Sequence, residues 1–356
     1  MSQKTNRKTA PMLQRNEDAK KAVVSKVAST VRRGVKPSHK KYVGAFVDAF
    51  YANVGPEDVL RVPVDLLAGC VASAWDQLQK RAPGKASVRV FNARQTRDGW
   101  DCPHSVIQIV NDDMPFLVDS VTEELNRQGH TVHSLIHPVI TARRDKNGRL
   151  LRLLPENSDA PDALAESVMH VEINELTRPG ALREVKRRLE AVLADVRLAV
   201  EDWRPMRHRI ADVMAELDSN DLPLPPAEIA ETVSFLRWVS DNHFTFLGYR
   251  EYDFKSVGKK TQLRIKPRTG LGILRSQDRT VFEGLQNQAE LPPVIADFLR
   301  QPAALMVSKA NERSTVHRAV HLDTIGVKKF DRRGKVVGER LFAGLFTSDV
   351  YNETVR

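Results

Sequence analysis

Residues 104–129 read HSVIQIVNDDMPFLVDSVTEELNRQG, and this stretch predicts a strand, a tight acidic turn and a helix in succession. The part up to Val110 is rich in β-branched residues, which suit a pleated, half-buried strand. In the helix, Pro115 stands in the first turn and Gly129 follows the end, an arrangement that helix termini favour. One face of this helix carries the apolar residues Leu117, Val118, Val121 and Leu125.

The segments on either side extend this unit into a predicted domain over residues 86–204. Residues 87–92 and 167–174 alternate between polar and apolar side chains, so each predicts a strand, the second with one buried face. Residues 131–141 are rich in β-branched side chains and predict a further strand. DKNG at 145–148 predicts a turn before a strand at 150–154. A helix from about Arg178 and a short strand at 200–203 complete a β-α-β-β-α-β order. That order is the ferredoxin-like arrangement, an antiparallel sheet with two helices on one face.

A second α+β unit is predicted over residues 227–356, after a helical linker at 205–226 that ends in prolines. Its predicted order is a helix, a strand pair at 243–254 and 262–274, short helices at 281–285 and 294–299, and strands at 304–310, 316–324, 327–330 and 336–346. This order is that of a PAS-like domain. The last strand has apolar residues on both faces, of which the helices can cover one. We therefore expect an exposed apolar patch around Phe342 and Phe346.

The first 85 residues divide into a basic arm and a helical segment at 37–85. The chain has 356 residues and a formal net charge of +10, and residues 1–41 hold 12 Lys and Arg against 2 Asp and Glu. The rest of the chain is therefore close to neutral. This distribution favours a solvated, disordered tail at residues 1–36 over a folded basic surface that could match nucleic-acid phosphates.

Composition limits the class of protein further. The apolar fraction is 41%, which excludes disorder of the whole chain, and no apolar run approaches the roughly 18 residues of a membrane span. Cys70 and Cys102 are the two cysteines, and the first residues lack a signal-peptide pattern, so a secreted disulfide scaffold is excluded. A cytoplasmic location fits best.

No motif in the sequence predicts catalysis or a bound nucleotide. Gly270 and Gly272 follow a strand, but Arg275 holds the third glycine position of a dinucleotide-binding loop. A phosphate-binding glycine–lysine loop and a Gly-x-Ser-x-Gly elbow do not occur in the sequence. We therefore expect no catalytic residue and no cofactor within the chain.

Histidines and cysteines are the candidate metal ligands and nucleophiles of the sequence. His133 and His137 face opposite to His130 on a strand, so these three do not predict a metal site. His317 and His321 could share a strand face but lack a third ligand nearby. Cys102 and His104 are two residues apart, and a thiol–base pair would need the surrounding fold to bring them together. We expect no metal.

The acidic turn allows two readings. Asp112 and Asp113 could cap the helix by interacting with its dipole and its free N–H groups. Alternatively, the turn could bind an amino acid, with helix amides at the carboxylate and an Asp at the ammonium. The candidate effector site comprises Asn111, Asp112, Asp113, Met114, Pro115 and Phe116.

Four motifs carry a resemblance to a known family. The stretches VNDDMPFLVDSV at 110–121, EDWRPM at 201–206, FLGYREY at 246–252 and GLFTS at 344–348 resemble the large bacterial NAD-specific glutamate dehydrogenases. The resemblance runs from about Tyr42 to the last residue. It implies ACT-type and PAS-type regulatory domains, with the catalytic domain and its NAD site lying beyond Arg356. The ACT pattern has glycine where this chain has Phe116, so a side chain fills space that a ligand would use.

The resemblance implies a non-catalytic, regulatory and oligomerisation segment of an enzyme that converts L-glutamate, NAD and water to 2-oxoglutarate, ammonium and NADH. The expected partners are a second copy of the chain, the downstream catalytic domain and an amino-acid effector. No membrane or nucleic-acid partner is expected. The alternatives are a stand-alone amino-acid sensor built from ACT and PAS modules, and an RNA-binding protein that uses the basic arm.

Overall fold

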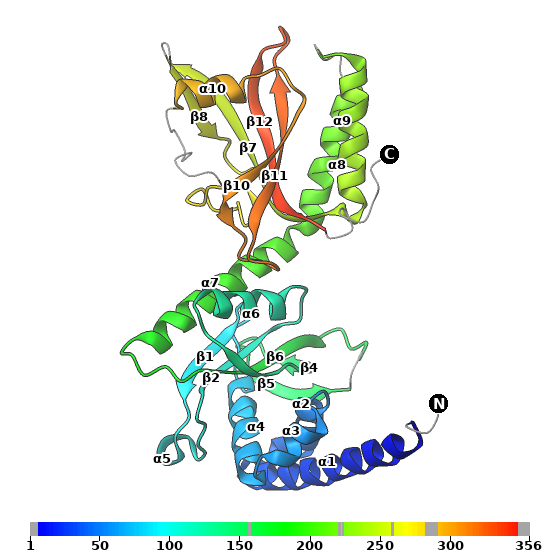
Figure 1. The fold of residues 1–356 in the computed structure, drawn as a ribbon, viewed down its shortest axis with the longest axis vertical. Coiled ribbons are helices and arrows are strands. Elements are labelled where there is room, and N and C mark those ends of the chain that lie inside the picture. The colour runs from blue at the N-terminus through cyan, green and yellow to red at the C-terminus, as the bar shows by residue number, and fades with distance from the viewer. Residues whose placement is uncertain are drawn as a thin grey trace. The chain divides into compact units, whose positions relative to one another are not determined.

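The computed structural model describes residues 6–155, 158–219, 222, 224–257, 260–281 and 291–347 (Figure 1). The chain divides into two compact units, Met1–Ala194 and Asp195–Arg356. The boundary falls within helix α7, Ala181–Glu201. Each unit is a mixture of helices and one antiparallel sheet, so the α+β class is confirmed. None of the helices in the described ranges is long and apolar enough to cross a membrane.

The first unit is built on an antiparallel sheet of order β1-β2-β6-β4-β5, with β3 also paired to β6. Its strands are β1 Ser87–Asn92, β2 Ser105–Asp112, β3 Val132–Ile136, β4 Val139–Arg144, β5 Leu150–Leu154 and β6 Leu164–Ile173. Helix α6, Leu117–Arg127, joins β2 to β3, and β6 lies between these two strands. The predicted strand–turn–helix is therefore confirmed, and it forms one half of a split β-α-β arrangement.

The predicted strand at residues 200–203 is wrong. Residues 200 and 201 end α7, and Trp203 begins α8, Trp203–Ser219. Buried Val192, Val196 and Ala199 continue the helical spacing of α7, so this segment stays helical. The edge beside β2 is instead filled by β1, which precedes β2 in the chain and pairs with it antiparallel. The pairing of β6 with both β2 and β3 is therefore ferredoxin-like, but the strand at the edge beside β2 comes before β2 in the chain and not after α7.

The two central strands, β2 and β6, are buried on both faces, whereas the sequence predicted one buried face. Every residue of β2 from Ser105 to Asn111 is buried, and so are residues 166–171 of β6. One face is covered by the N-terminal helices α1 Asn6–Gly34, α2 Lys40–Tyr51, α3 Pro56–Arg61 and α4 Val64–Leu78. Helices α2 and α4 contact the strands, and α1 packs on α2, α3 and α4. A short 3₁₀ turn, Pro37–His39, follows α1, and the short helix α5, Gln95–Asp98, lies between β1 and β2 in the chain. Figure 1 shows α6 and the first part of α7 on the opposite face.

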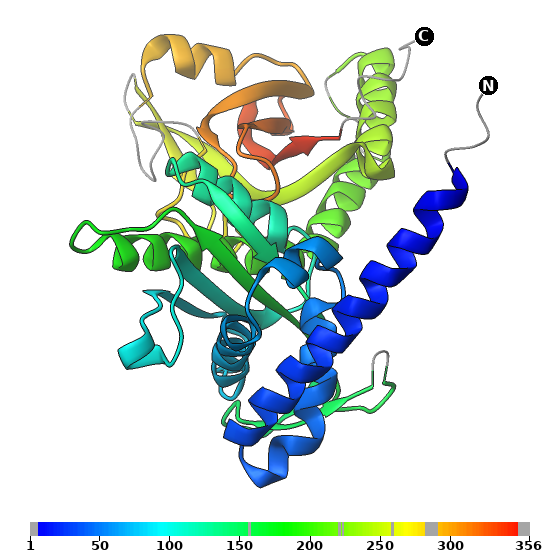
Figure 2. The ribbon, with the colours of Figure 1, turned by 60° about the horizontal axis from the view of Figure 1, so that its bottom comes forward.

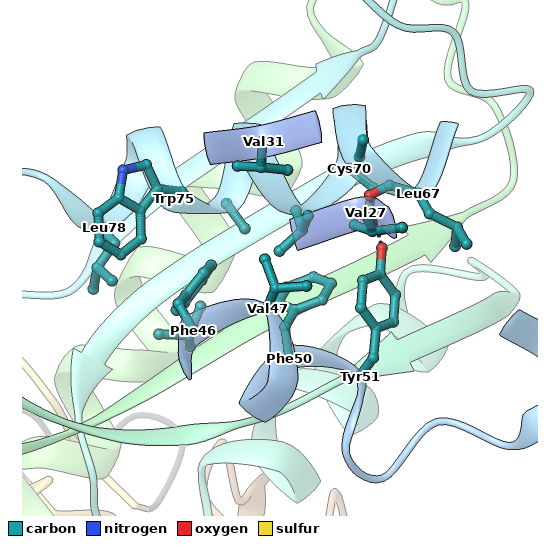
Figure 3. Close-up of a cluster of buried hydrophobic side chains, with 14 of the residues drawn as sticks. Val27, Val31, Phe46, Val47, Phe50, Tyr51, Leu67, Cys70, Trp75 and Leu78 are labelled. Carbon is teal, nitrogen blue, oxygen red and sulfur yellow. Dashed lines mark hydrogen bonds between the residues drawn. The ribbon is translucent and has the colours of Figure 1, made fainter. Parts of the chain in front are cut away.

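The expectation of a disordered basic tail is wrong for residues 6–34, which form α1. Figure 2 shows this helix alongside the other N-terminal helices. Its buried residues Val24, Val27, Ala28 and Val31 follow helical spacing, and Figure 3 shows Val27 and Val31 among side chains of α2 and α4. Lys20 donates to the backbone oxygens of Ala52 and Val54 at 2.9 and 2.7 Å. Lys20 is thus buried, whereas Arg15, Lys21, Lys26, Arg32 and Arg33 are exposed on the outer side of this packed helix.

The second unit has a sheet of order β10-β11-β12-β7-β8, with β9 paired to β7. Its elements are α8, α9 Pro226–Trp238, a π-helical turn Val239–His243, β7 Phe244–Val257, β8 Lys260–Ile265, β9 Leu271–Gly272, α10 Pro293–Leu299, β10 Leu305–Arg313, β11 His321–Phe330 and β12 Val336–Phe346. The strands predicted at 316–324 and 327–330 are one strand from His321 onward, β11, whereas residues 316–320 are irregular, so that part of the prediction is wrong. The helix predicted at 281–285 falls largely on residues 282–290, outside the described ranges.

The segment expected to be a linker carries part of the core of the second unit. Helix α8 buries Met206, Ile210 and Val213 against strands of the sheet together with residues of α9. On this side of β12, Phe342 is fully buried in the same cluster. On the other side, Leu341 lines a small apolar cavity with Leu263 and Leu299. Both faces of β12 are covered within the chain, so the expected exposed patch at Phe342 is wrong.

The packing of α1 can be tested with Val27→Ala. Because Val27 is fully buried in the first unit, its truncation should lower the free energy of unfolding by about 2 kcal/mol. The measurement is urea unfolding followed by tryptophan fluorescence. Ser25→Ala, at an exposed position of the same helix, should change stability by less than about 0.5 kcal/mol. Equal stabilities of the two variants would mean that α1 is not packed as described.

Candidate functional site

The predicted effector turn, residues 111–116, lies between β2 and α6 in the first unit. Asn111 is buried at the end of β2, whereas Asp113 and Pro115 are exposed. Phe116 precedes α6 with a φ of 71°, in the left-handed region that glycine adopts most easily. The turn therefore has the backbone conformation of a glycine-containing loop, with an aromatic side chain in place of the glycine.

Asp112 belongs to a group of ion pairs whose other members are buried. It accepts a hydrogen bond from Arg81, which also donates to Glu166 at 2.7 and 2.9 Å. Arg144 donates to the two oxygens of Glu166 at 2.7 and 2.6 Å. The side chains of Arg81, Glu166 and Arg144 are at most 4% exposed. Two cations and two anions balance here, which is the condition under which charged groups tolerate burial.

Asp113 remains the exposed acid of the turn. Its backbone N–H donates to the oxygen of Ala165 at 2.9 Å, which fixes the turn to β6. Burial lowers the pKa of His137, and the nearby Asp113 carboxylate partly offsets this effect. The imidazole of His137 lies 2.5 Å from the hydroxyl of Ser167. The turn thus presents one unburied carboxylate beside a half-buried imidazole.

A second group of polar side chains lies on the face of the sheet that the N-terminal helices cover. His170 of β6 is fully buried, and its Nε2 lies 3.4 Å from Sγ of Cys70 on α4. Its Nδ1 lies 3.4 Å from Nε2 of Gln108 on β2. Burial alone would lower the pKa of His170, but Cys70 and Glu172 outweigh this effect and raise it. His170 thus links α4 to both central strands.

Glu172, two residues along β6, connects His170 to the start of β2. Its Oε1 lies 3.3 Å from Nε2 of His170, and its Oε2 lies 2.9 Å from Nδ1 of His104. Burial would raise the pKa of Glu172, but the two histidines lower it to about 2. Burial raises the pKa of the Cys102 thiol to about 12, although the backbone N–H of His104 acts in the opposite direction. The ring of His133 stacks on His104 with centroids 4.2 Å apart. We call Cys102, His104 and Glu172 the Glu172 cluster.

The other candidates from the sequence have ordinary structural partners. His133 and His137 contact different groups, as described above, and Nδ1 of His321 lies 3.1 Å from the oxygen of Ala310. Gly272 has a φ of 59°, and a Cβ there would lie 2.1 Å from the oxygen of Leu247. Close backbone approach therefore explains this glycine.

Sequence reasoning missed the grouping around Glu172 because its members are far apart in the chain. His170 and Glu172 alternate on one strand face, and Cys102 and His104 are neighbours, so each pair carried a local signal. The pairing of β2 with β6 brings the two pairs together, and this pairing could not be read from spacing.

One family model and several known proteins are similar to this chain. Residues 46–189 match the family model described as glutamate dehydrogenase, ACT1 domain. The chain is 34% identical to the NAD-specific glutamate dehydrogenase of Pseudomonas aeruginosa over 314 residues, 88% of this chain and 19% of that protein. It is 33% identical to the Halomonas elongata enzyme over 342 residues, 96% of this chain and 21% of that protein. A Mycobacterium tuberculosis relative of the same name is 28% identical over 302 residues. The chain thus spans about a fifth of the length of the first two relatives.

The balance of buried charge beneath the turn can be tested with Glu166→Ala. This change removes the carboxylate that pairs with both Arg81 and Arg144 and keeps only the pair of Arg81 with Asp112 in this group, so it should lower the free energy of unfolding by about 3–5 kcal/mol. Urea unfolding measures this quantity. Glu57→Ala, which removes an ion pair with both side chains more than 70% exposed, is the matched control and should cost under about 1 kcal/mol. A loss from Glu166→Ala as small as that of the control would contradict the account of the buried charges.

Proposed function

Because this chain is related over most of its length to the bacterial NAD-specific glutamate dehydrogenases, we propose that it is an N-terminal regulatory and oligomerisation segment of such an enzyme. The parent enzyme converts L-glutamate, NAD and water to 2-oxoglutarate, ammonium and NADH in the cytoplasm. NAD and the reacting groups lie outside the chain, which has no catalytic residue. The observation that carries the proposal is the match of residues 46–189 to an ACT1 domain in a chain that spans a fifth of its relatives.

Within this proposal, the first unit is the ACT-type regulatory domain and the second is PAS-like. The arrangement of β2, α6, β3 and β6 supports the first assignment, since it is the split β-α-β pattern of ferredoxin-like sheets. The second assignment is supported by a five-stranded antiparallel path with helices covering it. The partners are a second copy of the chain and the downstream catalytic domain. Edge strand β5, where Leu151 is 51% exposed, supports self-association, because an apolar sheet edge requires cover.

We assign the effector role to the turn at residues 111–116, with an amino acid as ligand. Asp112 is already held by Arg81, so Asp113 is the acid that can face an ammonium group. The N-terminal amides of α6 face the carboxylate in this proposal. Phe116 then forms the apolar wall of the site and limits the size of the ligand side chain.

The non-catalytic role predicts that purified residues 1–356 form no NADH from glutamate and NAD. A longer chain that includes the proposed downstream catalytic domain should form NADH under the same conditions, which provides the positive control. The measurement is absorbance of NADH over time. Glutamate-dependent NADH formation by residues 1–356 alone would contradict the proposal.

The effector role predicts that calorimetric titration detects binding of an amino acid such as glutamate or aspartate. Asp113→Ala should weaken this binding at least tenfold, because the ammonium group loses its counter-charge. Glu123→Ala, which removes an acid from α6 outside the turn, is the control and should leave the affinity unchanged. Binding that is unaffected by Asp113→Ala would place the effector elsewhere.

A further inference from the structure

The Glu172 cluster joins three side chains of the kinds that bind transition metals. One ligand atom each from Cys102, His104 and Glu172 lies within 4.8 Å of the other two. Cys102 is buried, whereas the side chains of His104 and Glu172 are 30% and 23% exposed. The cluster is therefore closed on the sulfur side and reachable by water on the other.

The donor set indicates which metal ion would fit. A thiolate, an imidazole and a carboxylate are the ligands of Zn²⁺, with bonds of about 2.0–2.3 Å in a tetrahedral arrangement. Ligand atoms of such a site are roughly 3.4–3.8 Å apart, a value that follows from these bond lengths. The ligand atoms of the cluster lie within 4.8 Å of one another, so side-chain rotations that move them by about 1 Å give this spacing. Mg²⁺ and Ca²⁺ prefer oxygen ligands and do not match a cysteine.

We propose that Cys102, His104 and Glu172 bind one Zn²⁺ ion, with water as the fourth ligand. The site joins the segment before β2 to the end of β6, and it lies outside the turn at residues 111–116. The zinc site is independent of the effector proposal and stands whether or not that proposal holds.

The surroundings of the cluster support an organised metal site. Oε1 of Glu172 lies 3.3 Å from Nε2 of His170, and Oε2 lies 2.9 Å from Nδ1 of His104, so the ion would bind between Oε2 and that imidazole in place of their direct contact. His170 is in turn held by Cys70 and Gln108, so the carboxylate has a buried second layer of hydrogen-bonding groups. The ring of His133 stacks on His104 and restricts its rotation. Such outer groups orient ligands and raise metal affinity.

The experiment titrates the reduced, metal-free chain of residues 1–356 with Zn²⁺ by calorimetry and with Co²⁺ by absorption spectroscopy. One equivalent of each ion should bind, and Co²⁺ should produce a thiolate-to-metal charge-transfer band in the near ultraviolet. Cys102→Ser should abolish that band. Cys70→Ser, which removes the other thiol, should retain the band at saturating Co²⁺, because Cys70 contacts His170 and provides no ligand atom. A band that survives Cys102→Ser, or that is lost in Cys70→Ser alone, would overturn the assignment.

Two further variants keep the proposal testable if Cys102→Ser fails to fold. His104→Gln and Glu172→Gln change partly exposed side chains, and each should weaken Zn²⁺ binding at least tenfold. His137→Gln changes a histidine outside the cluster and should leave the affinity unchanged. Circular dichroism of the metal-free variants confirms that each is folded. Absence of one-to-one binding by the unaltered chain, or equal affinities in all three variants, would overturn the proposal.

Discussion

The burial of β2 and β6 on both faces is the constraint on which the first unit depends. A sheet with two buried faces needs a helical layer on each side, and α6 with the first part of α7 supplies one of them. The other layer must come from the N-terminal helices. Of these helices, α2 and α4 contact the strands, and α1 packs on α2 and α4 through Val27 and Val31. The basic segment at residues 6–34 therefore folds as a helix that covers α2 and α4, although its own composition does not favour a core.

The same constraint explains the positions of the polar groups. Gln108, Glu166 and His170 point from the central strands into a face that excludes water, so each must find a partner there. Ser73 on α4 bonds Gln108 at 3.1 Å, and Cys70 contacts His170. Arg81, just after α4, bonds Glu166. These contacts fix the N-terminal helices on the sheet, and they position Asp112 at one end of β2 and the Glu172 cluster at the other.

The sequence predicted the elements with strong local signals and missed those that depend on distant partners. The strand, turn and helix at 104–129 followed from β-branched residues, Pro115 and Gly129. Helix α1 was missed because its four buried apolar residues stand among basic ones, and the edge strand was misplaced because helical burial continues through Ala199. The left-handed conformation of Phe116 could not be expected from a phenylalanine. The grouping of Cys102, His104 and Glu172 required the register of β2 and β6.

Hydrogen exchange in the native state measures the two-sided burial most directly. The amides of β6 at residues 166–171 would be followed by mass spectrometry in the whole chain and in a chain that lacks residues 1–34. If α1 holds α2 and α4 against the sheet, its removal should speed exchange in these amides at least tenfold, while amides of β11 and β12 in the second unit keep their rates. Unchanged protection of residues 166–171 in the shortened chain would contradict the account.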